Sequence, residues 1–167
     1  MVKCVLIGKS SSGKSSLLKL VEQNGIATIG EVAREVLTKH PNYSRQHQQV
    51  KMLNLQYERE ELLKRTNTRF ISDRGLHDYY VFSQGVGLEI PFYRENLQYR
   101  YDLVFKLPNK PFRPDGIRIE TDDKQAQDLQ DRIERLYMET GHTLIEVPNL
   151  DLIGKYKFIL PFLKHTK

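Results

Sequence analysis

The feature that most constrains this chain is a glycine- and serine-rich loop between a short apolar segment and a helix near the N-terminus. Residues 8–15 read GKSSSGKS and fit the phosphate-loop pattern G-x-x-x-x-G-K-[ST]. Residues 2–7 form an apolar strand pattern, and an amphipathic helical pattern follows Ser15. A turn that binds nothing would fit the four fixed positions equally well, but the strand–loop–helix context favours a phosphate site.

The residue types of this loop predict individual roles. Gly8 and Gly13 let the backbone approach phosphates closely, and the amides and the helix N-terminus donate hydrogen bonds to them. Lys14 is expected to reach the β- and γ-phosphates, and the Ser15 hydroxyl is placed for Mg²⁺. The expected nucleotide-binding residues are Gly8, Lys9, Ser10, Ser11, Ser12, Gly13, Lys14, Ser15 and Ser16.

Length and charge narrow the class of protein. A chain of 167 residues with 39% hydrophobic residues suits one globular domain. It has no apolar run near the roughly 20 residues that span a bilayer, so we expect no membrane partner. Cys4 is the single cysteine, which favours the reducing cytoplasm. The net charge of +5 suits an anionic ligand such as a nucleotide; nucleic acid is possible but not favoured, because no Lys/Arg-rich block is present.

Strand and helix patterns alternate along the chain. The expected strands are residues 2–7, 26–29, 69–73, 102–107 and 143–147. The expected helices after the first are residues 31–37, 43–65, 76–84, 91–99, 125–140 and 152–163. This order predicts a single α/β domain with a five-stranded parallel sheet covered by helices on both faces. In the long helix 43–65 we expect Val50, Leu53, Tyr57 and Leu62 to form the apolar face.

Acidic residues follow two of these strands. Because parallel strands end at the same sheet edge, Glu31 and Asp73 should meet the phosphate loop in one crevice. Asp73 fits a magnesium ligand or a general base, and it could instead cap the helix that follows. Arg74 can pair with an acid and hold a phosphate. Glu31 is open to three roles: helix N-terminal acid, ligand of a substrate hydroxyl, or base.

Residues 108–124 read as a lid, because prolines, a glycine and basic side chains gather there. Arg113 and Arg118 could fold over a nucleotide and neutralise charge on a transferred phosphoryl group. An ordinary basic loop explains the same composition.

Five collinear segments carry a family resemblance: residues 8–15, 30–35, 70–78, 101–105 and 114–118. Together they resemble a P-loop kinase branch that includes nicotinamide riboside kinase domains and small ATPase- and kinase-like domains labelled AAA. The resemblance implies a nucleoside-kinase-like sheet in the order 2-3-1-4-5 and ATP or GTP with Mg²⁺ at the phosphate loop. The resemblance also implies that Glu31, the acid after the second strand, acts at the acceptor. It implies that Asp73 and Arg74 bind metal, act as a base or bind phosphate, and that Arg118 is a lid arginine.

The expected reaction is transfer of a phosphoryl group to a hydroxyl or phosphate of a small nucleoside- or nucleotide-like acceptor. The candidate catalytic residues are Lys14, Glu31, Asp73 and Arg118. The candidate substrate-binding residues are Glu31, Arg34 and Arg74, and the candidate metal ligands are Ser15 and Asp73.

Three alternatives stay open. A nucleotide monophosphate kinase would need an arginine-rich acceptor pocket, for which Arg34, Arg45, Arg74 and Arg94 are available. A polynucleotide 5′-kinase would show steep salt dependence. A nucleotide-binding regulatory module would hydrolyse slowly and need a partner. The acceptor, the ATP or GTP preference and the oligomeric state are not predicted.

Overall fold

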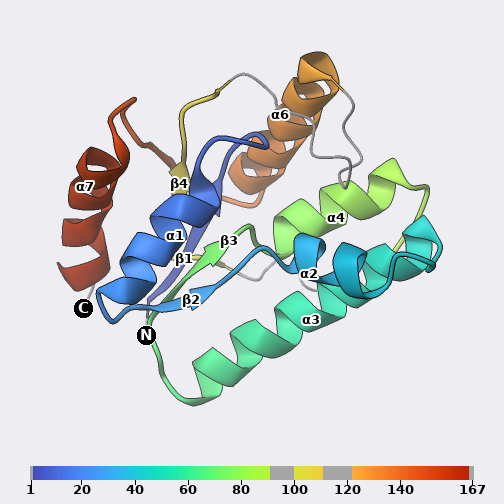
Figure 1. Cartoon of the computed structure of the whole chain (residues 1–167), viewed down its shortest axis with the longest axis horizontal. Helices are drawn as coiled ribbons and strands as arrows, with labels where there is room; N and C mark the ends of the chain where they lie inside the picture. The colour runs from blue at the N-terminus through green and yellow to red at the C-terminus, as the bar shows by residue number, and fades with distance from the viewer. Residues whose placement is uncertain (1, 91–99, 111–121, 166–167) are drawn as a thin grey trace.

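A computed structural model describes residues 2–90, 100–110 and 122–165 of the chain (Figure 1). Five parallel strands form one sheet in the order β2-β3-β1-β4-β5, which confirms the expected topology. The strands are β1 (Lys3–Ile7), β2 (Ala27–Ile29), β3 (Phe70–Asp73), β4 (Leu103–Lys106) and β5 (Leu144–Glu146). The described helices are α1 (Lys14–Gln23), α2 (Val32–Lys39), α3 (Arg45–Arg65), α4 (Leu76–Gly85), α6 (Asp123–Glu139) and α7 (Leu152–His165).

Alternating side chains of the central strand divide the core between the two faces of the sheet. Cys4 and Leu6 pack in one cluster with residues of α1 and α7. Val5 and Ile7 point the other way, into a cluster with residues of α4 and α6. Because both faces of β1 are covered, all four of these side chains are fully buried. Cys4 is thus the buried small residue that its place in the strand predicts, and burial raises the pKa of its thiol to about 12.

The third core cluster fixes the edge of the sheet near β2. Val32 and Val36 of α2 pack with Met52 and Leu53 of α3 and with Phe70 of β3. Figure 1 shows α3 and α4 on the side of the sheet opposite α1 and α7. β1 lies between β3 and β4, so the strand order reverses at β1. The connections that follow β1 and β3 therefore run to opposite faces of the sheet, and a crevice opens between them at the carboxyl ends of the strands.

The long helix α3 differs from its sequence-based prediction. It begins after Ser44, whose hydroxyl accepts a hydrogen bond from the His47 amide at 3.2 Å. Val50 is 39% exposed and Leu62 is 63% exposed, so the predicted apolar face is wrong at these two positions. The buried residues of α3 are Gln48, Gln49, Met52, Leu53, Gln56 and Glu60.

Buried hydrogen bonds explain why α3 turns polar side chains inward. The Gln56 amide donates to Glu60 Oε1 at 2.6 Å and to the Ser72 hydroxyl at 2.9 Å. Gln48 donates to the His40 carbonyl at 3.0 Å. These bonds compensate the desolvation of the polar groups, and the helix therefore faces the core with a mixed surface that hydrophobic periodicity does not reveal.

The boundaries of the other elements agree with the sequence to within a few residues. The helix expected at residues 91–99 and most of the expected lid, residues 111–121, lie outside the described residues. In the described ranges, no helix combines the length and the apolar character needed to cross a membrane.

Candidate active site

The phosphate loop joins β1 to α1 in a conformation that depends on its glycines. Gly8 has φ 150° and Gly13 has φ 95°, backbone angles that residues with a side chain rarely adopt. A Cβ atom on Gly8 would lie 2.9 Å from the Ser12 hydroxyl. The first intrahelical bond of α1 runs from the Leu17 amide to the Gly13 carbonyl at 3.1 Å, so the amides of the first turn are directed at the loop.

Lys14 lies inside this loop. Its amine donates to the carbonyls of Gly8 and Lys9 at 2.8 Å and 3.0 Å and to the Ser12 hydroxyl at 3.3 Å. The side chain is buried, so its charge is concentrated where the loop would surround a phosphate. The Lys14 amine therefore lies inside the loop that the sequence predicts to bind phosphate.

Ser15 and Asp73 meet across the gap between α1 and the end of β3. The Ser15 hydroxyl donates to Asp73 Oδ2 at 2.9 Å, while the buried Asp73 Oδ1 has no hydrogen-bond partner within the described chain. Mg²⁺ prefers oxygen ligands, and a hydroxyl and a carboxylate with one oxygen not hydrogen-bonded supply them. These two residues fit a magnesium ion. The described ranges contain no cluster of three or more His, Cys, Asp or Glu side chains arranged to bind a metal by themselves.

Burial perturbs the charge of Asp73. Removal from water raises the pKa of its carboxyl, and the nearby Glu31 acts in the same direction. The Lys14 and Arg74 charges and the hydrogen bond from Ser15 oppose this shift. The alternative role of Asp73 as a helix cap is wrong, because the Gly75 amide at the start of α4 donates to Asp78 Oδ2 at 3.0 Å instead.

Arg74 lies beside the loop in a left-handed backbone conformation, with φ 75°. Its guanidinium donates to Asp78 Oδ1 at 3.0 Å and to the Gly8 carbonyl at 3.3 Å. Its Cζ also lies 5.0 Å from the centroid of the Phe82 ring, within cation–π range. Burial alone would lower the pKa of Arg74, but the Asp78, Asp73 and Glu31 carboxylates outweigh it and raise the pKa. The cation is thus fixed between the loop and the start of α4.

A pocket opens next to the loop. Ser10 of the loop lines it, and so does Arg74, whose guanidinium contacts the loop at the Gly8 carbonyl. Its polar lining includes Glu31 and Gln49, and its apolar side includes Phe82. The complete described lining is Ser10, Glu31, Ala33, Leu37, Gln49, Met52, Arg74, Phe82, Gly85 and Leu129. The convergence of the phosphate loop with residues that follow β2 and β3 is therefore observed, as the parallel topology predicts.

Other predicted site residues lie elsewhere. Arg34 is 50% exposed, contacts Glu31 at 3.5 Å, and lines a neighbouring depression that Ser15 and Glu31 also line. The Lys9 amine turns away to form an ion pair with Asp123 at 2.6 Å. Ser16 is exposed. Arg118 and Arg113 lie outside the described residues.

Gln49 and Phe82 are pocket residues that sequence reasoning did not single out. Gln49 is almost fully buried, and its Oε1 atom has no hydrogen-bond partner within the described residues. Gln49 lies one helical turn before Leu53 and therefore on the same face of α3, which is the one sequence feature that could have indicated its burial. That this face is buried is known only from the tertiary packing.

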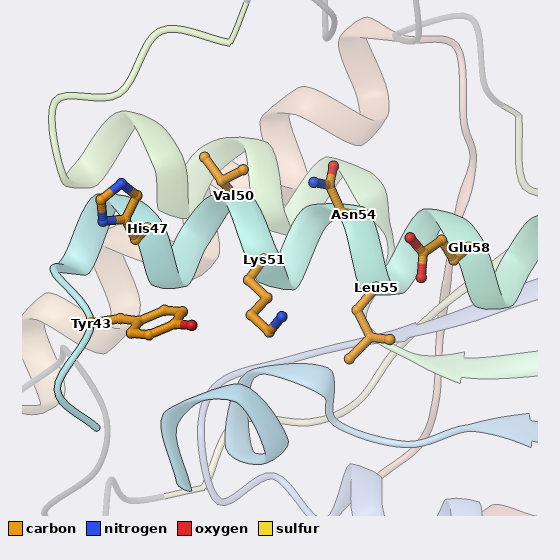
Figure 2. A pocket seen from close by; sticks show the side chains of 7 residues that line it. All are labelled: Tyr43, His47, Val50, Lys51, Asn54, Leu55 and Glu58. Carbon is orange, nitrogen blue, oxygen red and sulfur yellow. The ribbon is translucent and has the colours of Figure 1, made fainter. Parts of the chain in front are cut away.

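A second depression lies on the outer side of α3, away from the phosphate loop (Figure 2). Its lining side chains are Tyr43, His47, Val50, Lys51, Asn54, Leu55 and Glu58. They come from one helix and the turn before it, and none belongs to the loop or to a strand end. This depression is not a candidate for phosphate chemistry.

Comparisons with solved structures show the same fold. One similar structure is a deoxyadenosine kinase from M. mycoides with dCMP and a flexible dCDP bound, with a TM-score of 0.66 and 17% sequence identity. The alignment covers 99% of this chain and 100% of the kinase chain. Thymidylate kinase from Ehrlichia chaffeensis gives a TM-score of 0.65 at 13% identity, covering 98% of each chain. NadR protein in complex with NR gives 0.72 at 16% identity, covering 96% of this chain and 48% of its own.

No curated protein sequence matches the chain. A family model described as an AAA domain matches residues 3–153, which include the phosphate loop and the strand-end residues Glu31, Asp73 and Arg74. Two of the structural neighbours above are a deoxyadenosine kinase and a thymidylate kinase. The chain therefore belongs to this family of AAA P-loop domains.

Proposed function

We propose that this protein transfers the γ-phosphoryl group of ATP or GTP, in a Mg²⁺-dependent reaction, to a hydroxyl group of a small nucleoside-like molecule. The observation that supports this most directly is the shared wall between the two parts of the site. Ser10 and Arg74 line the pocket, while the Arg74 guanidinium also binds the Gly8 carbonyl of the phosphate loop. A donor phosphate and an acceptor would therefore be neighbours, as in-line transfer requires.

The chemistry of the pocket favours an acceptor with a flat ring and polar edges. Phe82, Met52 and Leu37 offer apolar surface, while Gln49 and Glu31 offer hydrogen-bonding groups. The structural neighbours include a deoxyadenosine kinase with dCMP bound and a protein bound to NR, and these ligands share that combination. We therefore place the acceptor in the nucleoside class.

Charge favours a hydroxyl over a phosphate as the accepting group. Arg74 is the only cation among the described residues of the pocket, and its guanidinium already pairs with Asp78. Glu31 adds a carboxylate at the same wall. A monophosphate acceptor would need several available cations, and of the arginines considered for that role Arg34 lines a different depression.

We assign roles as follows. Lys14 and the loop amides bind the donor phosphates, and Ser15 and Asp73 would hold Mg²⁺, which neutralises phosphate charge when bound. Because Asp73 is committed to Ser15, Glu31 is the better general base for the acceptor hydroxyl. Arg74 stabilises charge on the transferred group, and Arg118 remains a proposed lid arginine.

A screen of acceptors tests this proposal. Purified protein with ATP or GTP and Mg²⁺ is incubated with nucleosides, nicotinamide riboside, nucleoside monophosphates and 5′-hydroxyl oligonucleotides. We expect phosphorylation of a nucleoside-class compound, and we expect Lys14→Ala to abolish it. Lys51→Ala, an exposed lysine of α3, serves as the matched control and should keep wild-type turnover.

Each other outcome contradicts the proposal in a defined way. Transfer to monophosphates or to oligonucleotide ends would establish one of the other kinase classes. Tight nucleotide binding with slow hydrolysis and no acceptor would favour a regulatory module. Turnover by Lys14→Ala at the wild-type rate would refute the assignment of the phosphate loop as the donor site.

A further inference from the structure

The Asp78 carboxylate connects helix α6 to the phosphate loop. Its Oδ1 atom accepts the hydrogen bond from the Arg74 guanidinium at 3.0 Å. Its Oδ2 atom accepts from the Gly75 amide at 3.0 Å and from the Tyr137 hydroxyl at 2.8 Å. Asp78 is fully buried, so water cannot replace a lost partner. Both carboxylate oxygens are thus fixed, and one of them faces Arg74.

The packing around Gly75 shows that the Tyr137 hydroxyl is held closely. A Cβ atom at Gly75 would lie 2.7 Å from the Tyr137 hydroxyl oxygen and 2.6 Å from that of Tyr101. Only a glycine leaves this space. The Tyr137 ring is buried and stacks on His77, with ring centroids 4.5 Å apart. The hydroxyl therefore reaches Asp78 from a rigid position on α6.

Within the described residues, the other contacts of the Arg74 guanidinium are weaker. Its bond to the Gly8 carbonyl is 3.3 Å long, and its contact with Phe82 is a 5.0 Å cation–π contact. The ion pair with Asp78 is consequently the strongest constraint on where the cation lies. Without the Tyr137 hydroxyl, the Gly75 amide would be the one remaining partner of Asp78 Oδ2 among the described residues, so the carboxylate could rotate and shift the Arg74 guanidinium with it.

We propose that Tyr137 is a positioning residue for phosphoryl transfer: through Asp78 it fixes the Arg74 guanidinium between the phosphate loop and the acceptor pocket. Its kinetic consequence rests on the proposed function. The link runs from α6, the helix that follows the lid segment in the chain, to the carbonyl of the first loop glycine. Tyr137 touches neither nucleotide nor acceptor in this scheme and acts through Arg74 alone.

Tyr137→Phe tests the proposal and keeps the ring in the core. We expect kcat to fall about tenfold, the value of one hydrogen bond to a charged group, with KM for the nucleotide changed less than about twofold. Tyr101→Phe is the matched control, because it removes a second buried hydroxyl from the same cluster. That hydroxyl bonds to the Leu76 amide and to Glu60 rather than to Asp78, so turnover should stay close to wild type.

A double-mutant cycle with Arg74→Lys separates positioning from general damage. If Tyr137 acts through Arg74, the losses of Tyr137→Phe and Arg74→Lys will not add. Additive losses, or an equal fall of kcat in Tyr101→Phe, would overturn the proposal. Asp78→Asn keeps the side-chain size but puts an N–H donor where Asp78 accepts hydrogen bonds and removes the charge that pairs with Arg74, so its fall in kcat should be at least as large as that of Tyr137→Phe.

Side-chain NMR of the arginine guanidinium groups gives a readout that does not need turnover. Rotation about the Nε–Cζ bond of Arg74, assigned with Arg74→Lys, should be slow in wild type and in Tyr101→Phe and faster in Tyr137→Phe. Unchanged rotation in Tyr137→Phe would overturn the positioning role whatever happens to kcat. Absence of phosphoryl transfer by wild-type protein would instead refute the proposed function, and the NMR result would still decide the positioning role.

Discussion

Replacing Asp73 by asparagine should stabilise the nucleotide-free protein while it removes function. The carboxyl group is fully buried, and one of its oxygens lacks a hydrogen-bond partner among the described residues. An unsatisfied buried polar group costs about 1–3 kcal/mol and a charged one costs more, so removal of the charge is favourable, although the attraction of Lys14 and Arg74 recovers part of the excess in wild type. Asp73→Asn keeps the shape and can still accept the Ser15 hydrogen bond. We expect the free energy of unfolding to rise by about 1–2 kcal/mol, or about 3–6 °C in Tm.

The pH dependence gives the prediction its sign. Burial raises the pKa of Asp73 in the folded protein above the ordinary value of 3.8. The folded state therefore keeps a proton at pH values where the unfolded chain has lost it, and wild type loses stability as the pH rises through this range. The advantage of Asp73→Asn should be absent near pH 3, grow above about pH 4, and become constant above the raised pKa.

Urea denaturation of both proteins from pH 3 to pH 8, without nucleotide, measures this difference. Addition of Mg²⁺ and nucleotide should reverse the order, because a ligand at 100 times its Kd stabilises wild type by about 2.7 kcal/mol and the variant has lost a proposed metal ligand. If Asp73→Asn is less stable than wild type at pH 7 without nucleotide, burial of the Asp73 charge does not destabilise the nucleotide-free protein and the reasoning is refuted.

Three further predictions concern the scaffold. Gly75→Ala should lower the free energy of unfolding by about 1–3 kcal/mol, because its Cβ would overlap two buried tyrosine hydroxyls; a stability equal to wild type in urea denaturation would contradict this. His77→Phe should flatten the loss of stability between pH 6.5 and 4.5. Burial and the neighbouring His142 lower the pKa of His77 to about 3, so the unfolded chain binds a proton that the folded protein does not, at up to about 1.4 kcal/mol per pH unit. Leu53→Ala should lower the free energy of unfolding by about 2–5 kcal/mol and Leu62→Ala by less than about 0.5 kcal/mol, since Leu53 is buried and Leu62 is exposed. Equal falls in Tm for the two variants would instead indicate that Leu62 is buried, as the sequence pattern predicts.

Much of the site was predictable because the fold places strand ends together. A parallel α/β order brings every loop that follows a strand to one edge, so the phosphate loop, Glu31 and Asp73 had to converge. Ser15 and Asp73 are 58 residues apart, yet their side chains are hydrogen-bonded at 2.9 Å. Arg34 shows the limit of this reasoning. Glu31 lines both the pocket beside the loop and the neighbouring depression, whereas Arg34 lines only the neighbouring depression.

The inward face of α3 was not predictable from periodicity. Gln56 and Glu60 are buried because Ser72 and Tyr101, which come from distant parts of the chain, supply their hydrogen bonds. Hydrophobic periodicity assumes that polar residues face water, and this assumption fails where a buried network supplies hydrogen bonds to them. Val50 and Leu62 were assigned to the core for the same reason, and both are exposed.

The phosphate loop and the order of strands and helices could be predicted from the residues alone, because both depend on local backbone demands: glycines at positive φ, a strand before them and a helix after. Three other features follow from the packing of distant elements: Asp78 caps α4, Arg74 is fixed between Asp78 and the Gly8 carbonyl, and Gln49 lines the pocket. These contacts join elements through a buried polar network. Their energies depend on which partners burial brings within hydrogen-bond distance, and no local pattern of residues records that.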